Sequence, residues 1–335
     1  MHAIRQHAFG PPETLVVEEV DAPEPGPGQV RIAVRAAGVH LVDTSIRSGQ
    51  AGPMPLPVLP FVPGREVAGV VDAVGPEVDA AWVGRRVVAH LGPASGGYAE
   101  LAVRDVAEVI AVPDGPDGTP LDHAAAVAMV GTGRTTLAIL EFTGGLDPGD
   151  VVLVAAAAGG IGGLLVQAAR RAGAAVVALA GGPDKVEATR RLGADLSVDY
   201  RAPGWPEDVR KGLDALGLPP PTVSFDGVGG EAGRHALELL GVGGRVVLFG
   251  WSSGTATRLS AEDLVGRGVT AIPAIGPRLL GRPGGFRDLS EGALAAAAAG
   301  ELVPLVHPPF PLAEAAAAHR ALEGRATIGK VVLVP

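Results

Sequence analysis

The sequence predicts an α/β protein in which a doubly wound parallel sheet is accompanied by a second, β-rich domain. Two observations lead to this prediction. In the second half of the chain, apolar strand-like segments alternate with helix-like segments of about 10 to 15 residues, which is typical of βαβ units. The first third consists instead of short apolar segments bounded by glycine and proline, which is typical of β-strands joined by turns.

The composition limits the possible classes of function. With 335 residues the chain is long enough for two domains, and its net charge of −9 argues against nucleic acid or anionic membrane as the main partner. It contains no cysteine, which excludes disulfides, thiolate metal sites and cysteine nucleophiles. The apolar run from Val151 ends at Gln167, short of the roughly 18 to 20 residues that span a bilayer. We therefore expect a soluble, cytoplasmic protein without a signal peptide or a membrane partner.

The β-rich domain is expected to use both ends of the chain. Its first strands are 28–39, 66–75 and 84–92. The proline-dense segment 52–64 is expected to be a loop, because proline removes donors from a β-ladder. The closing strand 329–335 has no partner inside a completed nucleotide-binding domain, so we expect it to return to the first third. The predicted domains are therefore a discontinuous one, 1–123 and 270–335, and a continuous one, 124–269.

The continuous domain is expected to hold a parallel sheet covered by helices on both faces. Its strand-like segments are 151–157, 174–180, 196–200, 222–229 and 244–251. Its helix-like segments are 161–173, 183–194 and 231–240. Two further helices are expected nearer the end of the chain, over 291–299 and 312–323.

A glycine cluster joins the first strand of this sheet to its helix. It reads Ala157-Ala158-Gly159-Gly160-Ile161-Gly162, which has the spacing of a dinucleotide-binding turn with alanine at the first glycine position. Gly159 would let the backbone approach a pyrophosphate, and Gly162 would let the helix pack on the strand. The unpaired N–H groups at the start of the helix would then bind the phosphates. In a glycine-rich chain the pattern alone is weak evidence, but the surrounding βα units favour a nucleotide site.

The end of the next strand indicates which nicotinamide cofactor is bound. NAD sites usually carry an acidic residue about 20 residues past the glycines. Here that position holds Gly181 and Gly182, so no carboxylate repels a 2′-phosphate, and Lys185 offers a counter-charge. The sequence therefore favours NADPH over NADH. The alternative is that Lys185 is an ordinary solvated residue in the first turn of a helix.

The ordered set of motifs resembles the zinc-independent quinone oxidoreductases, the zeta-crystallin-like group of the medium-chain dehydrogenase/reductase superfamily. The resemblance runs nearly from end to end. Besides the glycine cluster, it rests on 36–49, 59–75, 96–101, 125–140, 184–195, 225–230, 244–250 and 319–335. It implies a GroES-like catalytic domain of β-strands beside a Rossmann-type domain, with NADPH in the cleft between them.

The resemblance also implies roles for individual residues. Lys185 and Tyr200 would bind the 2′-phosphate, although Tyr200 can equally be an ordinary surface aromatic at a strand end. Thr135 would contact the nicotinamide, and Lys330 would lie near the cofactor cleft. The backbone that lines the path of the nicotinamide would come from Gly227, Val228, Phe249 and Gly250.

Zinc is not expected in this chain. Zinc-dependent members of the superfamily take a cysteine near position 40 and a histidine just after the glycine at 64, but this chain has no cysteine and carries Arg65 there. A makeshift set of His40, Glu66 and His90 is a remote alternative, because zinc needs three or four well-placed ligands. We therefore predict no metal ligands.

A metal-free reductase suits acceptors that delocalise charge. Hydride transfer from NADPH to a quinone, or to the β-carbon of an enone, gives an anion for which a Lewis acid is less necessary. His40 is a candidate hydrogen-bond or proton donor, the alternative being a histidine bonded within its domain. Asp43 either orients a residue of the site or caps the following helix.

Several residues depart from the pattern of the quinone oxidoreductases. His40 stands where those enzymes commonly carry asparagine. Ser45 and Gly52 stand where they commonly carry tyrosines, so the expected pocket stacks a flat quinone less well. Ser45 completes the candidate catalytic set of His40, Asp43, Ser45 and Thr135. Arg134 either meets an anionic substrate group or lies on the surface, and Trp251 is expected near the cleft or its rim.

These departures leave other functions open. An enoyl reductase acting on an enoyl thioester, as in polyketide synthases, is the close alternative. A protein that binds NADPH without turnover, crystallin-like or redox-sensing, is the other. The expected partners are a small-molecule quinone or enone and a second copy of the chain, paired through edge strands around 244–251 and 268–273.

Overall fold

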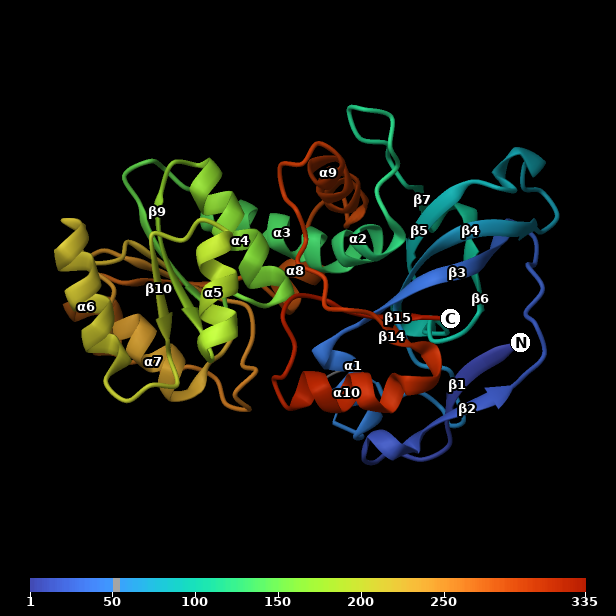
Figure 1. Ribbon diagram of the computed structural model, residues 1–335, viewed down its shortest axis with the longest axis horizontal. Coiled ribbons are helices and arrows are strands. Elements are labelled where there is room, and N and C mark those ends of the chain that lie inside the picture. The colour runs from blue at the N-terminus through green and yellow to red at the C-terminus, as the bar shows by residue number, and fades with distance from the viewer. Residues whose placement is uncertain (51–54) are drawn as a thin grey trace. The chain divides into compact units, whose positions relative to one another are not determined.

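The computed structural model describes residues 1–50 and 55–335, and the chain divides into two compact units. The first unit comprises Met1–Gly133 and Ser290–Pro335, so both ends of the chain lie in it (Figure 1). The second unit comprises Arg134–Leu289. The first three residues of the loop predicted over 52–64, Gly52 among them, lie outside the described residues.

The first unit is built on a seven-stranded sheet and a two-stranded sheet. The larger sheet has the order β14-β15-β3-β4-β5-β7, and β6 also pairs with β3. Its strands are β3 (Gln29–Val39), β4 (Glu66–Val74), β5 (Arg86–His90), β6 (Leu101–Asp105), β7 (Val109–Ala111), β14 (Phe310–Pro311) and β15 (Val331–Val334). The smaller sheet pairs β1 (His2–Gln6) with β2 (Leu15–Glu19) in antiparallel register.

The closing strand completes the larger sheet. β15 runs antiparallel to β3, with Val331 opposite Val39 and Leu333 opposite Ala37. The predicted return of the closing strand to the first third of the chain is thereby confirmed. β3 alternates between buried and more exposed side chains up to Arg35, and its last four residues are all buried. Three of these, Ala37 to Val39, pair with β15.

Short helical segments connect these strands. The α-helices are α1 (Leu41–Arg47), α2 (His123–Ala128), α9 (Arg287–Ala298) and α10 (Ala315–Glu323). The 3₁₀ turns are η1 (Pro12–Thr14), η2 (Ala80–Trp82), η3 (Gly92–Ala94), η4 (Val106–Glu108) and η7 (Leu312–Glu314), and η5 (Met129–Gly133) is a π-helical turn. Of the two helices predicted near the end of the chain, the first begins earlier than expected, at Arg287. The second opens as the 3₁₀ turn η7 before it continues as α10.

The second unit holds a six-stranded parallel sheet in the order β10-β9-β8-β11-β12-β13. Its strands are β8 (Val151–Ala155), β9 (Ala175–Ala180), β10 (Leu196–Asp199), β11 (Val223–Asp226), β12 (Arg245–Leu248) and β13 (Thr270–Pro273). Its helices are α3 (Arg134–Thr143), α4 (Gly160–Arg171), α5 (Pro183–Arg191), α6 (Trp205–Leu216), α7 (Gly230–Glu238) and α8 (Pro277–Leu280), with the π-helical turn η6 (Glu262–Gly266). The predicted doubly wound parallel sheet is confirmed.

The strand order creates a switch point between β8 and β11. From β8 the chain winds outward through β9 and β10, then returns to β11 and winds the other way through β12 and β13. In doubly wound sheets, ligands bind outside the carboxyl ends of the strands at such a point. All five residues of β8 are buried, so the core of the unit fixes the position of the carboxyl end of this strand.

The borders of the two units differ from the predicted domain borders. Residues 270–289 belong to the second unit, because β13 extends the parallel sheet and pairs with β12, Thr270 lying opposite Arg245. Residues 124–133 belong to the first unit, where most of α2 and all of η5 are buried. The predicted border at residue 270 therefore differs from the border of the units, although 268–273 was also expected to supply an edge strand, as β13 does. In the described part of the chain, no helix is both long and apolar enough to cross a membrane.

Candidate functional site

The predicted glycine turn lies at the carboxyl end of β8. Ala156 has a φ of +52°, which turns the chain sharply after the strand, and Gly159 is the N-cap of α4. A Cβ on Gly162 would lie 2.3 Å from the carbonyl oxygen of Ala156, so only glycine lets α4 pack this closely on the end of β8. No side chain caps the start of α4, where Gly160 and Ile161 begin the helix. The turn therefore offers backbone N–H groups to an anion, and it fits a dinucleotide phosphate.

A basic side chain that the sequence analysis missed, that of Arg201, lies over the two glycines that follow β9. A Cβ on Gly182 would lie 2.1 Å from Nη2 of Arg201, and one on Gly181 would lie 3.3 Å from its Cδ, so Arg201 covers both glycines. Lys185 and Tyr200, the predicted 2′-phosphate residues, are half-buried on α5 and just after β10. Arg201 directly follows Tyr200, a predicted 2′-phosphate residue, and this adjacency could have indicated that Arg201 lies at the same site.

A carboxylate also lies near this strand end, although the sequence places none at the end of β9. Asp199 ends β10, the neighbouring parallel strand, and lies opposite Ala180. It accepts a 3.0 Å hydrogen bond from the backbone N–H of Arg201, and its Oδ1 lies 3.5 Å from Arg201 Nε. Asp199 and Arg201 therefore form an ion pair at the ends of β10 and β9, with Lys185 in the first turn of α5 as a further basic residue.

The ends of β11 and β12 meet on the other side of the switch point. The side chain of buried Asp226 accepts hydrogen bonds from the N–H groups of Val228 (2.8 Å) and Gly229 (2.9 Å), which fixes the loop after β11. A Cβ on Gly227 would lie 2.5 Å from Cε2 of Phe249. The structure therefore brings together the four predicted cofactor-lining residues, Gly227, Val228, Phe249 and Gly250.

The start of α3 carries two residues singled out by the sequence. Thr135 is half-buried in the first turn, and its predicted contact with a nicotinamide stays a prediction. The guanidinium carbon of Arg134 lies 5.0 Å from the ring centroid of Phe286. The side chain of Arg134 therefore has an aromatic partner within its own unit. Trp251, in the segment after β12, is more than half exposed at 56%.

In the first unit, a buried carboxylate joins two cationic side chains. Glu66 is completely buried; its Oε2 lies 2.8 Å from Nε2 of His40, and its Oε1 lies 2.5 Å from Nζ of Lys330. The three residues stand at the ends of three adjacent strands, His40 after β3, Glu66 at the start of β4 and Lys330 before β15. Burial by itself opposes the charge of Glu66, but His40 and Lys330 outweigh it and hold the pKa of this carboxyl below its ordinary value.

Asp43 supports the turn that carries His40. Its Oδ2 accepts a 2.8 Å hydrogen bond from the backbone N–H of His40 and a 3.3 Å bond from the hydroxyl of Tyr98. That hydroxyl also lies 3.0 Å from Nε2 of His319. Burial raises the pKa of the Asp43 carboxyl. Asp43 therefore acts on the backbone at the start of α1. Ser45 is half-buried on the same helix, where its carbonyl accepts hydrogen bonds from Ser48 and Gln50.

Metal ligation has no support in the described residues, among which no three histidine, aspartate or glutamate side chains form a set that would hold an ion. Both oxygens of Glu66 are engaged by His40 and Lys330. Zinc independence stays a prediction, and a chelator experiment below tests it.

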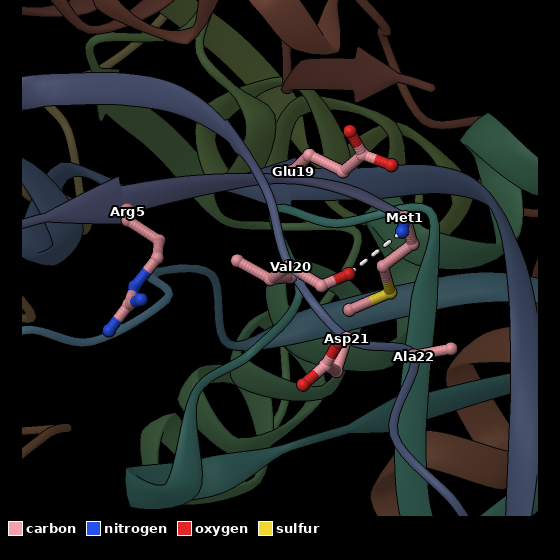
Figure 2. Close-up of a pocket in the computed structure, with 6 residues that line it drawn as sticks. All are labelled: Met1, Arg5, Glu19, Val20, Asp21 and Ala22. Atoms are coloured by element: carbon pink, nitrogen blue, oxygen red, sulfur yellow. Dashed lines mark hydrogen bonds between the residues drawn. The ribbon is translucent and has the colours of Figure 1, made fainter.

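A separate hollow lies beside the two-stranded sheet. Figure 2 shows the residues that line it, with the terminal amine of Met1 donating a 2.8 Å hydrogen bond to the carbonyl of Val20. The other lining residues are Arg5, Glu19, Asp21 and Ala22. None of the predicted catalytic or cofactor residues lines this hollow, so we do not assign the reaction to it.

Two family models match the two halves of this architecture. Residues 26–114 match the alcohol dehydrogenase GroES-like domain, and residues 160–292 match a domain described as zinc-binding dehydrogenase. The first match lies in the β-rich unit, and the second covers the parallel sheet from the start of α4. Together they confirm a GroES-like domain beside a Rossmann-type one.

Curated relatives and solved structures cover the whole chain. The chain is 36% identical to a 2-haloacrylate reductase of Burkholderia sp. over 98% of its own length and 97% of the relative's. It is 34% identical to a quinone oxidoreductase of Pseudomonas aeruginosa, with 98% of each chain covered. The structure of Escherichia coli quinone oxidoreductase in complex with NADPH matches all of both chains with a TM-score of 0.84 at 29% identity. The chain therefore belongs to the quinone oxidoreductase group of the medium-chain dehydrogenase/reductase superfamily.

Proposed function

We propose that this protein is an NADPH-dependent reductase that transfers hydride to a quinone or an α,β-unsaturated carbonyl acceptor without a zinc ion. The observation that carries the proposal is the buried ion set around His40. This residue stands near the chain position at which zinc-dependent members of the superfamily take a cysteine ligand. An imidazole that contacts Glu66, whose other oxygen is held by Lys330, is suited to donate a proton to a reduced acceptor.

The second unit provides the proposed NADPH site. Ala157 and Gly162 allow the tight turn and the close packing of α4, while Gly159, Gly160 and Ile161 present the backbone to the pyrophosphate. The NADPH complex of the Escherichia coli relative supports this cofactor. When bound, the nicotinamide supplies a hydride to an electron-poor carbon of the acceptor.

Other residues of the second unit select and orient that cofactor. We propose that Lys185, Tyr200 and Arg201 bind the 2′-phosphate. Arg201 covers the glycines after β9, the backbone N–H of Tyr200 donates to the carbonyl of Ala180 at the end of β9, and Lys185 lies in the first turn of α5. The nicotinamide would be lined by Thr135, Gly227, Val228, Phe249 and Gly250. Asp226 keeps the loop after β11 in place by accepting two of its backbone N–H groups.

His40 provides the proton that the reduced acceptor requires. Hydride addition to an enone leaves an enolate, and hydride addition to a quinone leaves a hydroquinone anion. In this proposed step His40 gives one ring proton to the anion, its N–H bond breaking as the O–H bond of the enol or hydroquinone forms, while Nε2 lies 2.8 Å from Oε2 of Glu66. Asp43 fixes the backbone of His40 during this step.

A direct assay tests the proposal. The loss of reduced-nicotinamide absorbance would be followed with NADPH and NADH on simple quinones, small enones and enoyl thioesters, with and without a chelator. We expect turnover of a quinone or an enone with NADPH preferred and no effect of the chelator. Exclusive turnover of enoyl thioesters would favour a polyketide-type enoyl reductase. Tight NADPH binding without turnover would favour a non-catalytic, crystallin-like or redox-sensing protein.

One comparison favours a second acceptor class. The Burkholderia relative is named for the reduction of a 2-haloacrylate, which is an unsaturated carboxylate. In this chain two basic side chains, His40 and Lys330, meet the carboxylate of Glu66, while the buried carboxyl of Asp43 binds the backbone of His40. We propose that these basic side chains attract an anionic acceptor. Adding 2-chloroacrylate and its methyl ester to the panel tests this, since only the acid should be preferred.

Oligomeric state and location remain proposals. We propose a homodimer that forms through β13, which is one of the two edge strands of the parallel sheet, the other being β10. An unpaired edge strand is a ready site for pairing with a second copy. Sedimentation showing only monomers at micromolar concentration would contradict this. A cytoplasmic location likewise stays a prediction, to be checked by cell fractionation.

A further inference from the structure

The contacts of Glu66 extend beyond His40. Each oxygen of this fully buried carboxylate meets a different cation, Oε2 the imidazole of His40 and Oε1 the ammonium of Lys330. The side chain of Lys330 is only 5% exposed, whereas that of His40 is 24% exposed. The three side chains therefore form a row in which Lys330 is the innermost cation and His40 the one that solvent or a substrate can reach.

The backbone around Lys330 is built to aim its side chain. Its N–H donates to the carbonyl of Leu305 (2.8 Å), and its own carbonyl accepts from the N–H of His307 (2.9 Å). Just before it, Gly329 has a φ of +73°, and a Cβ there would lie 2.3 Å from the Leu305 carbonyl oxygen. Lys330 is therefore fixed on both sides by the segment that runs alongside it, and its direction is not left to a flexible terminus.

The charges of His40, Glu66 and Lys330 indicate how Lys330 assists proton transfer. When His40 is protonated, the set has two positive charges and one negative. When His40 has given up its proton, Lys330 still balances Glu66. A buried carboxylate without a cation is very unfavourable, so a pair of His40 and Glu66 alone would resist losing the proton. With Lys330 present, the carboxylate keeps a counter-charge in both states.

We propose that Glu66 and Lys330 are positioning residues for His40. Glu66 holds the imidazole through Nε2–H, and Lys330 holds the other oxygen of Glu66 so that the carboxylate stays in place while His40 donates and regains its proton. This inference rests on the proposed role of His40 as the proton donor. It also gives Lys330 a role distinct from the cofactor contact that the family resemblance implies.

Double-mutant cycles test whether Lys330 acts through Glu66 and Glu66 through His40. The variants are H40N, E66Q, K330M, H40N/E66Q and E66Q/K330M, with kcat measured on the best acceptor and the Kd for NADPH measured by fluorescence. Because a general acid contributes about 10²-fold or more, H40N should lower kcat by about 10²-fold, and E66Q by about tenfold. Since Glu66 acts through His40, E66Q should change kcat by less than about twofold in the H40N background. K330M should likewise add little to E66Q, and all Kd values for NADPH should stay within about twofold.

Two controls keep the result interpretable. E231Q removes a carboxylate from an exposed pair with Arg258, 3.0 Å apart, and should leave kcat unchanged. If K330M does not fold because it leaves Glu66 without its second cation, E66Q/K330M removes both charges and supplies the comparison. Additive losses of kcat in H40N/E66Q would overturn the inference while leaving the reductase proposal intact. An increased Kd for NADPH in K330M would assign Lys330 to the cofactor instead.

A spectroscopic measurement separates this inference from the proposed function. Side-chain ¹⁵N NMR of the imidazoles, with the His40 signal identified by its loss in H40N, reports which ring nitrogen carries the proton. At a pH where the ring is neutral, we expect the Nε2–H form of His40 in the wild type and a mixture of tautomers in E66Q. The same mixture in both proteins would overturn the positioning role. Because the readout needs no substrate, it holds even if no acceptor in the panel is reduced.

Discussion

Gly38 on β3 leaves the space that the carboxylate of Glu66 occupies: a Cβ at residue 38 would lie 2.0 Å from Oε1. Gly131 plays the same part for the other oxygen, since its Cβ would lie 2.2 Å from Oε2 and 3.2 Å from Cε1 of His40. The buried ion set is therefore enclosed by backbone on two sides. Neither glycine has a positive φ, so backbone conformation does not require glycine here. Glycine is needed because a side chain would overlap with Glu66.

We expect G38A to disturb the ion set directly. The added methyl group overlaps with the carboxylate, and overpacking of a buried site typically costs about 1–3 kcal/mol. The free energy of unfolding in urea should fall by this amount, and kcat should fall with it as Glu66 moves away from His40. G26A is the matched control, since its Cβ would meet only the flexible side chain of Gln29 at 3.3 Å. Equal stability and kcat in G38A and G26A would contradict the tight enclosure.

Arg201 is expected to contribute to the choice of cofactor. R201A removes the guanidinium that lies over Gly182, and one charge-assisted hydrogen bond is worth about 1.5–3 kcal/mol. The KM for NADPH should rise by roughly tenfold or more, while the KM for NADH changes little. R210A is a suitable control, because Arg210 is an exposed residue of α6 that lies 3.5 Å from Glu207. An equal rise of both KM values in R201A would mean that Arg201 is structural.

Substitution of Gly162 tests the nucleotide turn. The Cβ of G162A would meet the carbonyl oxygen of Ala156, and backbone cannot move aside as a side chain can. We expect α4 to shift from the end of β8, with weaker binding of both NADPH and NADH and a lower Tm. G149A, whose Cβ would meet nothing within 4 Å, should behave as the wild type. Unchanged binding of both cofactors in G162A would show that the turn does not hold the phosphates.

Much of the fold follows from local patterns, whereas the contacts between distant segments do not. The strand, turn and helix around Gly159 could be predicted because their signals lie within one stretch of sequence. His40 and Glu66 were considered together only as a remote zinc set with His90, and Lys330 only near the cofactor cleft, because the register of β15, β3 and β4 is what joins the three. Arg201 was overlooked for the same reason, since its position over Gly182 depends on the pairing of β10 with β9.

His319 should make the protein less stable in mild acid. Its side chain is completely buried, and this burial, together with the nearby charge of Arg47, lowers its pKa to about 3. In the unfolded chain His319 binds a proton below about pH 6.5, whereas in the folded protein it stays neutral until about pH 3. The free energy of unfolding therefore decreases as the pH falls from about 6.5 to about 3. As the pH is lowered from 6.5 to 5, the contribution of His319 is lost before that of Glu66, because the contribution of Glu66, whose pKa lies below its ordinary value of 4.5, is lost at lower pH.

The variant H319Q isolates this effect, because an amide keeps a hydrogen bond with Tyr98 but does not titrate. From pH 7 to pH 5 we expect the wild type to lose about 2 kcal/mol more free energy of unfolding than H319Q, measured by urea titration at each pH. His123 is the control, since burial also lowers its pKa, and H123Q corrects for its share. Parallel losses in the wild type and H319Q would mean that His319 takes up its proton in the folded state, with Tyr98 and Asp43 rearranged around it.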